Sequence, residues 1–175
     1  MIYTFVLLGN PGAQYERTRH NIARLVFAMI DDEISRIPHC EYFIPDTFMN
    51  ESGKALREYL KYHEGREVVV VYDDKDLPIG TLRISYDKSD GGHNGVKNVI
   101  EHLGTQEFIR VRIGIAPRGE GGETVLVHGD MVQKYVMGTI TQDEETAYRE
   151  LAPAVVRAVR DIAELGYQKA MERNN

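Results

Sequence analysis

Apolar runs of different spacing divide the chain into alternating strand and helix candidates. Residues 2–8 and 67–72 are short and almost wholly apolar, which is typical of strands buried on both faces of a sheet. Residues 22–37 carry apolar side chains close to helical spacing, which predicts a helix. By the same criteria we expect strands at 42–44, 81–86 and 108–116, and helices at about 53–62, 96–103, 131–137 and 143–165.

Two of these segments also indicate which side chains are buried. Alternation along 108–116 places Arg110 and Arg112 on one face and Val111, Ile113 and Ile115 on the other. Segment 143–165 has an apolar stripe that most simply packs on the sheet, a partner interface being the less favoured use. We expect a bend at Pro153, an end at Gly166, and one or two further turns over 167–173.

Composition describes an ordinary globular chain. The 175 residues, 42% apolar and 27% charged, fit one domain over 1–175 with a substantial core. The apolar runs are far too short to span a bilayer, and we expect no signal peptide because a basic leader with a long apolar segment is absent. The single cysteine, Cys40, excludes an internal disulfide. We therefore predict a soluble, cytoplasmic, single-domain protein.

The net charge of −6 argues mildly against a nucleic-acid partner, because phosphate binding usually depends on a basic face. A local patch could still bind. Segment 83–118 has six Lys and Arg residues against four acidic ones, a slight local excess.

The stretch 9–21, GNPGAQYERTRHN, joins the first strand to the first helix. Pro11 fixes its own φ and Gly12 tolerates a left-handed backbone, so this is a tight turn at the carboxyl edge of the sheet, where α/β folds keep their ligand crevices. Asn10 ends the strand and His20 lies near the helix N-terminus, which favours the neutral imidazole that a general base needs. The alternative is a common turn beside a solvated histidine.

The polar segment 45–52, PDTFMNES, contains two large apolar residues, Phe48 and Met49. One of them is expected to tie the loop to the following helix as a hydrophobic staple. The other reading is an apolar contact for a ligand, with Asn50 offering both a donor and an acceptor. Ser52 or Asn50 is the expected N-cap.

Polar residues follow two later strands. The acids of 73–76 could form a cation site or simply be solvated, or Asp73 could orient an imidazole if its strand neighbours the first. Leu77 to Gly80 is expected to turn the chain. The glycine-rich segment 87–97, DKSDGGHNGVK, is either an anion or carbonyl cradle or a plain turn with Asn94 as N-cap. Segment 117–129 is expected to be a mobile surface loop.

Several catalytic motifs are absent. The chain has no GxSxG, no HExxH and no pair of cysteines, and its six histidines are dispersed. What it offers is a set of amides and carboxamides, one candidate base and one candidate orienting carboxylate. That inventory suits the addition of water to an activated acyl group.

Five motifs, taken in their order along the chain, resemble those of the bacterial-type peptidyl-tRNA hydrolases. They are GNPGxxYxxTRHN, PxTFMNxSG, YDDxDLPxG, GGHNGxK and RVRIGI, and the ending KAMERNN is also similar. The resemblance runs from Tyr3 to the tail. It implies a monomeric α/β fold with a mixed twisted β-sheet flanked by helices. It also implies hydrolysis of the ester between a peptide and the 3′-terminal ribose of tRNA, without a metal or cofactor and without a membrane or obligatory protein partner.

The resemblance also implies roles for individual residues. His20 is the base that activates water, Asp73 orients it, and Asn10 holds substrate or water and helps to select blocked aminoacyl groups. The residues implied in binding the peptide and the acceptor end of tRNA are Tyr15, Phe48, Met49, Asn50, Gly92, Asn94 and Arg112.

Three departures from the family pattern accompany this match. The segment before PDTFMN is short by about a hairpin, Ser85 stands where many members carry a basic residue, and the chain is acidic where most are basic. Two other functions stay open from the sequence: an RNA-binding module that keeps the fold, and a hydrolase that acts on peptides.

Overall fold

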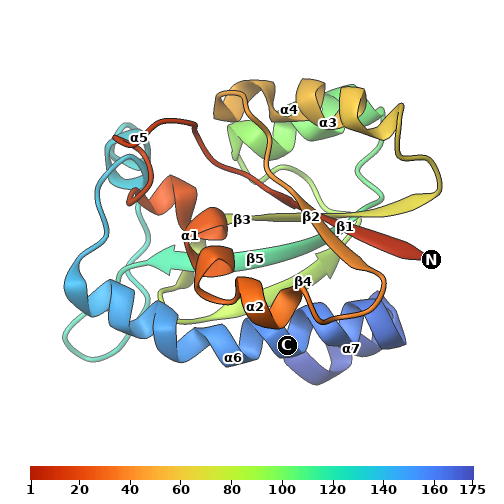
Figure 1. Ribbon diagram of the computed structural model, residues 1–175. Coiled ribbons are helices and arrows are strands. Elements are labelled where there is room, and N and C mark those ends of the chain that lie inside the picture. Colours follow the sequence, from red (N-terminus) through yellow and green to blue (C-terminus); the bar gives the residue numbers. More distant parts are fainter.

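The computed structural model describes residues 1–175 as a central sheet with helices on both faces (Figure 1). The strands are β1 (Ile2–Leu7), β2 (Cys40–Phe43), β3 (Arg66–Pro78), β4 (Leu82–Tyr86) and β5 (Ile109–Ala116). The α-helices are α1 (Ile22–Met29), α2 (Asp31–Ile34), α3 (Ser52–Leu60), α4 (Asn94–Leu103), α5 (Met131–Val136), α6 (Gln142–Leu165) and α7 (Tyr167–Asn174). Two 3-10 turns, η1 (Arg19–Asn21) and η2 (Met49–Glu51), precede α1 and α3.

The five strands form one mixed sheet in the order β2-β1-β3-β5-β4. β1 pairs in parallel with β2 and with β3, β3 pairs in parallel with β5, and β4 is antiparallel to β5. β1 and β3 are parallel neighbours, so their carboxyl ends lie at the same edge of the sheet. This is the arrangement needed for Asp73 to reach a residue that follows the first strand. The predicted α/β fold with a mixed sheet and flanking helices is confirmed.

Each buried strand contributes side chains to both faces of the sheet. Phe5 and Leu7 of β1 belong to the larger core, which α1, α2, α6 and α7 cover, whereas Val6 and Leu8 belong to a smaller core under α3 and α4. This explains the continuous apolar run, because period-2 alternation with both faces covered leaves no polar position. The stripe of α6, including Val155, packs in the larger core, as predicted.

Two predicted boundaries are wrong. The helix expected over 22–37 is interrupted at Ile30, whose φ of −125° and ψ of 18° are not helical, and three acidic residues then suit the first turn of α2. The strand expected to end at Tyr72 instead continues as β3 to Pro78, with a register shift against β5 between Asp74 and Pro78. Gly114 permits this pairing, since a Cβ there would lie 2.1 Å from the carbonyl oxygen of Pro78.

The helix ends also differ from the expected caps. The residue at the N-cap of α3 is Glu51, with no side-chain cap bond, and the hydroxyl of Ser52 donates to the carbonyl of Met49 instead. α6 continues through Pro153 and begins with a capping box between Thr141 and Glu144. No helix combines the length and the apolar composition needed to cross a bilayer.

Candidate functional site

His20 and Asp73 meet at the carboxyl edge of the sheet. η1 presents His20 from the turn after β1, and Asp73 lies on β3 just beyond its apolar run. The His20 Nδ1 atom lies 2.9 Å from each carboxylate oxygen of Asp73. Both residues are buried, with exposed fractions of 8% and 3%. The structure thus brings together the candidate base and the candidate orienting carboxylate.

A second histidine, His93, completes this cluster. Its Nε2 lies 2.8 Å from Asp73 Oδ1, and its ring centroid is 4.9 Å from that of His20. His93, rather than Asn94, occupies the N-cap of α4, where its Nδ1 accepts from the backbone N–H of Val96 at 3.3 Å. Sequence reasoning missed His93, although a histidine between a Gly-Gly pair and a helix start was visible as a signal.

The hydrogen bonds fix the proton positions on both rings. Because His93 Nδ1 accepts from Val96, the proton of that ring lies on Nε2 and points at Asp73. Asp73 accepts from His93 and, in the same way, from Nδ1–H of His20. Nε2 of His20 is therefore left with its lone pair free, which is the arrangement that a general base requires.

The charge of Asp73 dominates the electrostatics of the pair. Burial lowers the pKa of His20, but the negative charge and hydrogen bond of Asp73 outweigh burial and raise the pKa above the ordinary 6.5. Burial raises the pKa of Asp73, but the two imidazoles outweigh it and hold the pKa well below its usual range. The direction of the His20 pKa shift is therefore set by the adjacent carboxylate and not by the helix N-terminus.

The same three residues are the only group of side chains that could together hold a metal ion, since their ligand atoms lie within 4.8 Å of one another. The bond from Val96 argues against such use of His93. It directs a proton, rather than a lone pair, from His93 Nε2 toward Asp73. The arrangement fits a hydrogen-bonded cluster better than a set of metal ligands.

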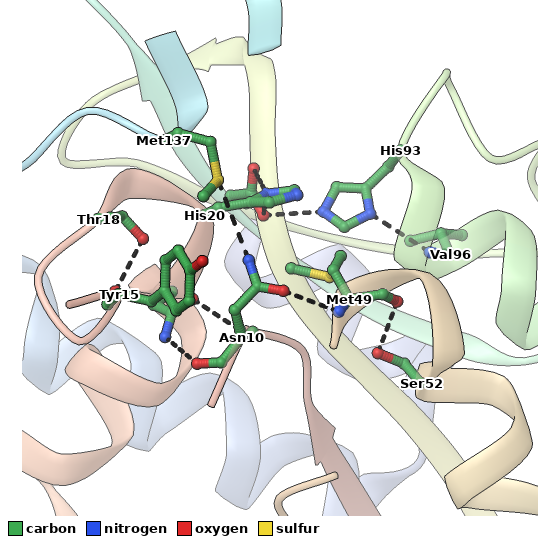
Figure 2. Close-up of polar contacts among 12 residues, drawn as sticks. Asn10, Tyr15, Thr18, His20, Met49, Ser52, His93, Val96 and Met137 are labelled. Atoms are coloured by element: carbon green, nitrogen blue, oxygen red, sulfur yellow. Dashed lines mark hydrogen bonds and ion pairs between the residues drawn. The ribbon is translucent and has the colours of Figure 1, made fainter. Parts of the chain in front are cut away.

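Asn10 is held by bonds on three sides. Its backbone N–H donates to Asn21 Oδ1, and Asn21 Nδ2 donates back to the Asn10 carbonyl, both at 2.9 Å. Asn10 Oδ1 accepts from the backbone N–H of Met49 at 2.8 Å, while Nδ2 faces the Sδ of Met137 at 4.0 Å (Figure 2). With the oxygen engaged, the carboxamide has one defined orientation and its NH₂ is available to a ligand.

A cavity of about 320 Å³ opens beside Asn10 and His20, and we call it the carboxamide cavity. Phe48 is 51% exposed and makes an edge contact with Tyr15, whereas Met49 is only 5% exposed and packs in the smaller core. Phe48 is therefore the residue free to contact a ligand, and Met49 ties the loop down. The lining residues are Asn10, Tyr15, His20, Phe48, Met49, Asn50, Asn94, Gln133 and Met137.

A second cavity of about 170 Å³ borders all three residues of the cluster, and we call it the polar cavity. Its walls include His20, Asp73, Gly92, His93 and Asn94, together with charged residues from β3, β5 and the 87–92 loop. Arg112 is among them, but its Nε donates to Asp74 Oδ2 at 2.7 Å. His20, Asn94 and Gln133 line both cavities, so the candidate base lies where the two meet.

The chain matches known proteins over nearly its whole length. The family model described as peptidyl-tRNA hydrolase matches residues 4–175. The peptidyl-tRNA hydrolase of Caldanaerobacter subterraneus subsp. tengcongensis is 36% identical, covering 99% of this chain and 100% of the relative. That of Bacillus licheniformis is 38% identical, covering 98% and 97%.

The solved structures agree in fold. The crystal structure of peptidyl-tRNA hydrolase from Acinetobacter baumannii superposes with a TM-score of 0.83 at 24% identity, covering 99% of this chain and 94% of the other. A complex of peptidyl-tRNA hydrolase with N-propanol gives a TM-score of 0.85 at the same identity. Taken with the family match over residues 4–175, these findings show that the chain belongs to the peptidyl-tRNA hydrolase family.

Proposed function

We propose that this protein hydrolyses the ester that joins a peptide, or an N-blocked aminoacyl group, to the 3′-terminal ribose of tRNA. The observation that carries the proposal is His20, held through Nδ1 by Asp73, in the same cavity as the oriented carboxamide of Asn10. Membership of the peptidyl-tRNA hydrolase family supports the choice of substrate.

His20 acts as general base in this mechanism. Its Nε2 takes a proton from water as the water oxygen attacks the ester carbonyl carbon, and Asp73 stabilises the resulting imidazolium. When the tetrahedral intermediate collapses, the C–O bond to the ribose breaks and the proton passes to the leaving 3′ oxygen. An ester needs no covalent enzyme intermediate for this, because ribose oxygen leaves more readily than an amine.

Asn10 provides both stabilisation and selectivity. Because Oδ1 is occupied by Met49, Asn10 offers only N–H donors to a ligand, and these can donate to the ester oxygen as it gains negative charge. The same donors bind the carbonyl of a blocking acyl group. A free α-ammonium also presents only donors, so it gains no bond from Asn10 and is disfavoured.

The two cavities suggest how the substrate lies. We place the acyl group in the carboxamide cavity, against Phe48 and Asn50, and the acceptor end of tRNA across Tyr15, Asn94 and the glycine-rich loop at Gly92. Arg112 is a weaker candidate for a phosphate contact than its sequence position suggests, because Asp74 already neutralises it.

The test compares His20→Ala with the wild-type protein on N-acetyl-aminoacyl-tRNA and on its unblocked counterpart. We expect wild-type protein to cleave the blocked substrate preferentially and His20→Ala to lose about 10²- to 10⁴-fold in rate. His63→Ala is the control, since that ring stacks on Tyr59 and contacts neither cavity. Full activity of His20→Ala would exclude the mechanism.

The same assay separates the alternatives. Tight RNA binding without hydrolysis by wild-type protein would favour the RNA-binding module, and cleavage of N-blocked peptide amides at a useful rate would favour a peptide hydrolase. We further propose that the protein acts in the cytoplasm. We also propose that it acts as a monomer, because one chain supplies His20, Asp73, His93 and Asn10. Sedimentation of the active species tests the monomer.

A further inference from the structure

Arg24 on α1 lies where the edge of the sheet opens. β1 and β2 pair in parallel only as far as Val6 and Phe43. Beyond that point the two segments diverge into the loops that line the carboxamide cavity. Arg24 Nη2 donates to the carbonyl oxygens of Gly9 and Pro45, each at 2.8 Å, and its Nε donates to Leu7 at 3.3 Å. The guanidinium thus replaces the strand–strand bonds that end before it.

Arg24 donates only to the backbone, as the buried Arg110 also does. Arg24 makes no ion pair, and its three bonds are all to backbone carbonyls. Burial lowers its pKa, with the charge of Asp46 opposing that effect. A partly buried cation without a carboxylate partner is costly, and here three carbonyl dipoles compensate it.

Gly9 fits against this side chain. A Cβ at Gly9 would lie 2.5 Å from Arg24 Nε and 2.8 Å from its Cδ, so any larger residue would displace the guanidinium. The glycine and the arginine therefore act as one unit at the root of the loop that carries Asn10.

We propose that Arg24 is a positioning residue for the hydrolytic reaction, which sets the distance between the two walls of the carboxamide cavity; this rests on the proposed function. One wall begins at Gly9 and carries Asn10, and the other begins at Pro45 and carries Phe48 and Asn50.

The walls are joined at two places. Arg24 joins them at the base, and the 2.8 Å bond from the Met49 N–H to Asn10 Oδ1 joins them at the cavity itself. That second bond determines where the NH₂ of Asn10 points. Loss of the Arg24 bonds lets the two walls separate and moves the Asn10 donors away from the ester oxygen. This change lowers kcat more than it raises KM. A lysine cannot substitute, because an ammonium on a flexible stem does not reproduce a planar fork that reaches three carbonyls.

The experiment measures kcat and KM of Arg24→Ala and Arg24→Lys on N-acetyl-aminoacyl-tRNA, with circular dichroism to establish the folded fraction. We expect a loss in kcat/KM of about tenfold to a hundredfold, mainly in kcat. Dilute guanidinium ion should restore part of the activity of Arg24→Ala, and urea at the same concentration should not. The control Arg36→Ala removes an exposed arginine that follows α2, and its activity should stay within about twofold of wild type.

Gly9→Ala is the second variant, which keeps the charge of Arg24 but displaces it. It should lose kcat in the same way even if Arg24→Ala does not fold. Folded Arg24→Ala and Gly9→Ala with wild-type kcat would overturn the positioning role while leaving the hydrolase function intact. Absence of hydrolysis by wild-type protein would overturn both.

Discussion

Replacing Asp73 with asparagine exchanges one carboxylate oxygen for an NH₂ group at the centre of the cluster. In the wild-type protein Asp73 accepts from His20 Nδ1 and His93 Nε2. In the wild-type protein His93 Nε2 bonds to Oδ1 alone, whereas His20 Nδ1 lies 2.9 Å from both oxygens, so an NH₂ group in place of Oδ2 faces only His20. His93 keeps the acceptor, because the N–H of Val96 holds its Nδ1 unprotonated. The new NH₂ then faces His20 and drives the His20 proton onto Nε2.

Two effects follow, and both reduce activity or change its pH dependence. The proton on Nε2 blocks the atom that must accept a proton from water, for which we expect kcat to fall about 10²- to 10⁴-fold. Asp73→Asn also removes the charge that raises the pKa of His20, leaving burial, which lowers it. The acidic limb of the pH–rate profile should therefore lie above 6.5 in the wild-type protein and move to lower pH in the variant.

The assay is kcat on N-acetyl-aminoacyl-tRNA from roughly pH 5 to pH 9, a range that brackets the titration of an imidazole. Asp161→Asn is the matched control, because Asp161 is also buried but bonds to Asn174 on α7, away from both cavities. Asp73→Asn activity close to wild type, or an acidic limb that does not move, would refute the assignment of tautomers and the role of Asp73.

Three further predictions concern other contacts. Asn10→Asp replaces the free donors by an acceptor, so the rate of N-acetyl-aminoacyl-tRNA hydrolysis should fall about tenfold or more, and the preference over unblocked aminoacyl-tRNA should shrink. The ratio of the kcat/KM values for the two substrates measures this preference, and an unchanged ratio would contradict the prediction. Asp74→Asn removes the negative charge that neutralises Arg112, so tRNA should bind more tightly. The slope of log binding constant against log salt concentration, measured by titration at several salt concentrations, should steepen by about one. An identical slope would show that Arg112 contacts no phosphate. Glu144→Gln weakens the paired bonds from Arg19, at 2.8 and 2.9 Å, and the capping box of α6. Urea denaturation should show a loss of about 1–3 kcal/mol in the free energy of unfolding, whereas the same change at the exposed Glu150 should lower it little.

The sequence carries enough information to place His20 beside Asp73. Both follow runs whose apolar character marks them as buried strands, and parallel neighbours end at the same edge of a sheet. His93 is different, because its contact with Asp73 depends on how α4 is seated over β3. The Gly-Gly pair before it and the helix start after it mark its position, but they do not show which residue it contacts.

Arg110 shows a similar limit. Alternation places it on the same face as Arg112, and that description is correct for the strand. Yet Arg110 is fully buried, donating to the carbonyls of Lys88 and Ser89 and lying over the Phe108 ring, whereas Arg112 borders a cavity. The period of a strand assigns a side chain to a face but does not show whether a loop covers that face. The role of Arg24 is not predictable from the sequence for the same reason, since its partners are backbone carbonyls, which any residue type can supply.

The distribution of charge bears on where this protein derives its selectivity. Around the polar cavity Arg112 is paired with Asp74 and Lys75 with Asp76, and Lys88 makes no ion pair. A phosphate approaching this side must compete with carboxylates for Arg112 and Lys75, so these two cations contribute less than they would on a basic surface. In the proposed mechanism, more of the binding free energy then comes from uncharged contacts close to the scissile ester, above all from Asn10. An enzyme that gains little binding free energy from the body of the tRNA and more from the blocked acyl group discriminates at the group it has to recognise. The placement of the Asn10 carboxamide then matters more for selectivity than the net charge of −6 does.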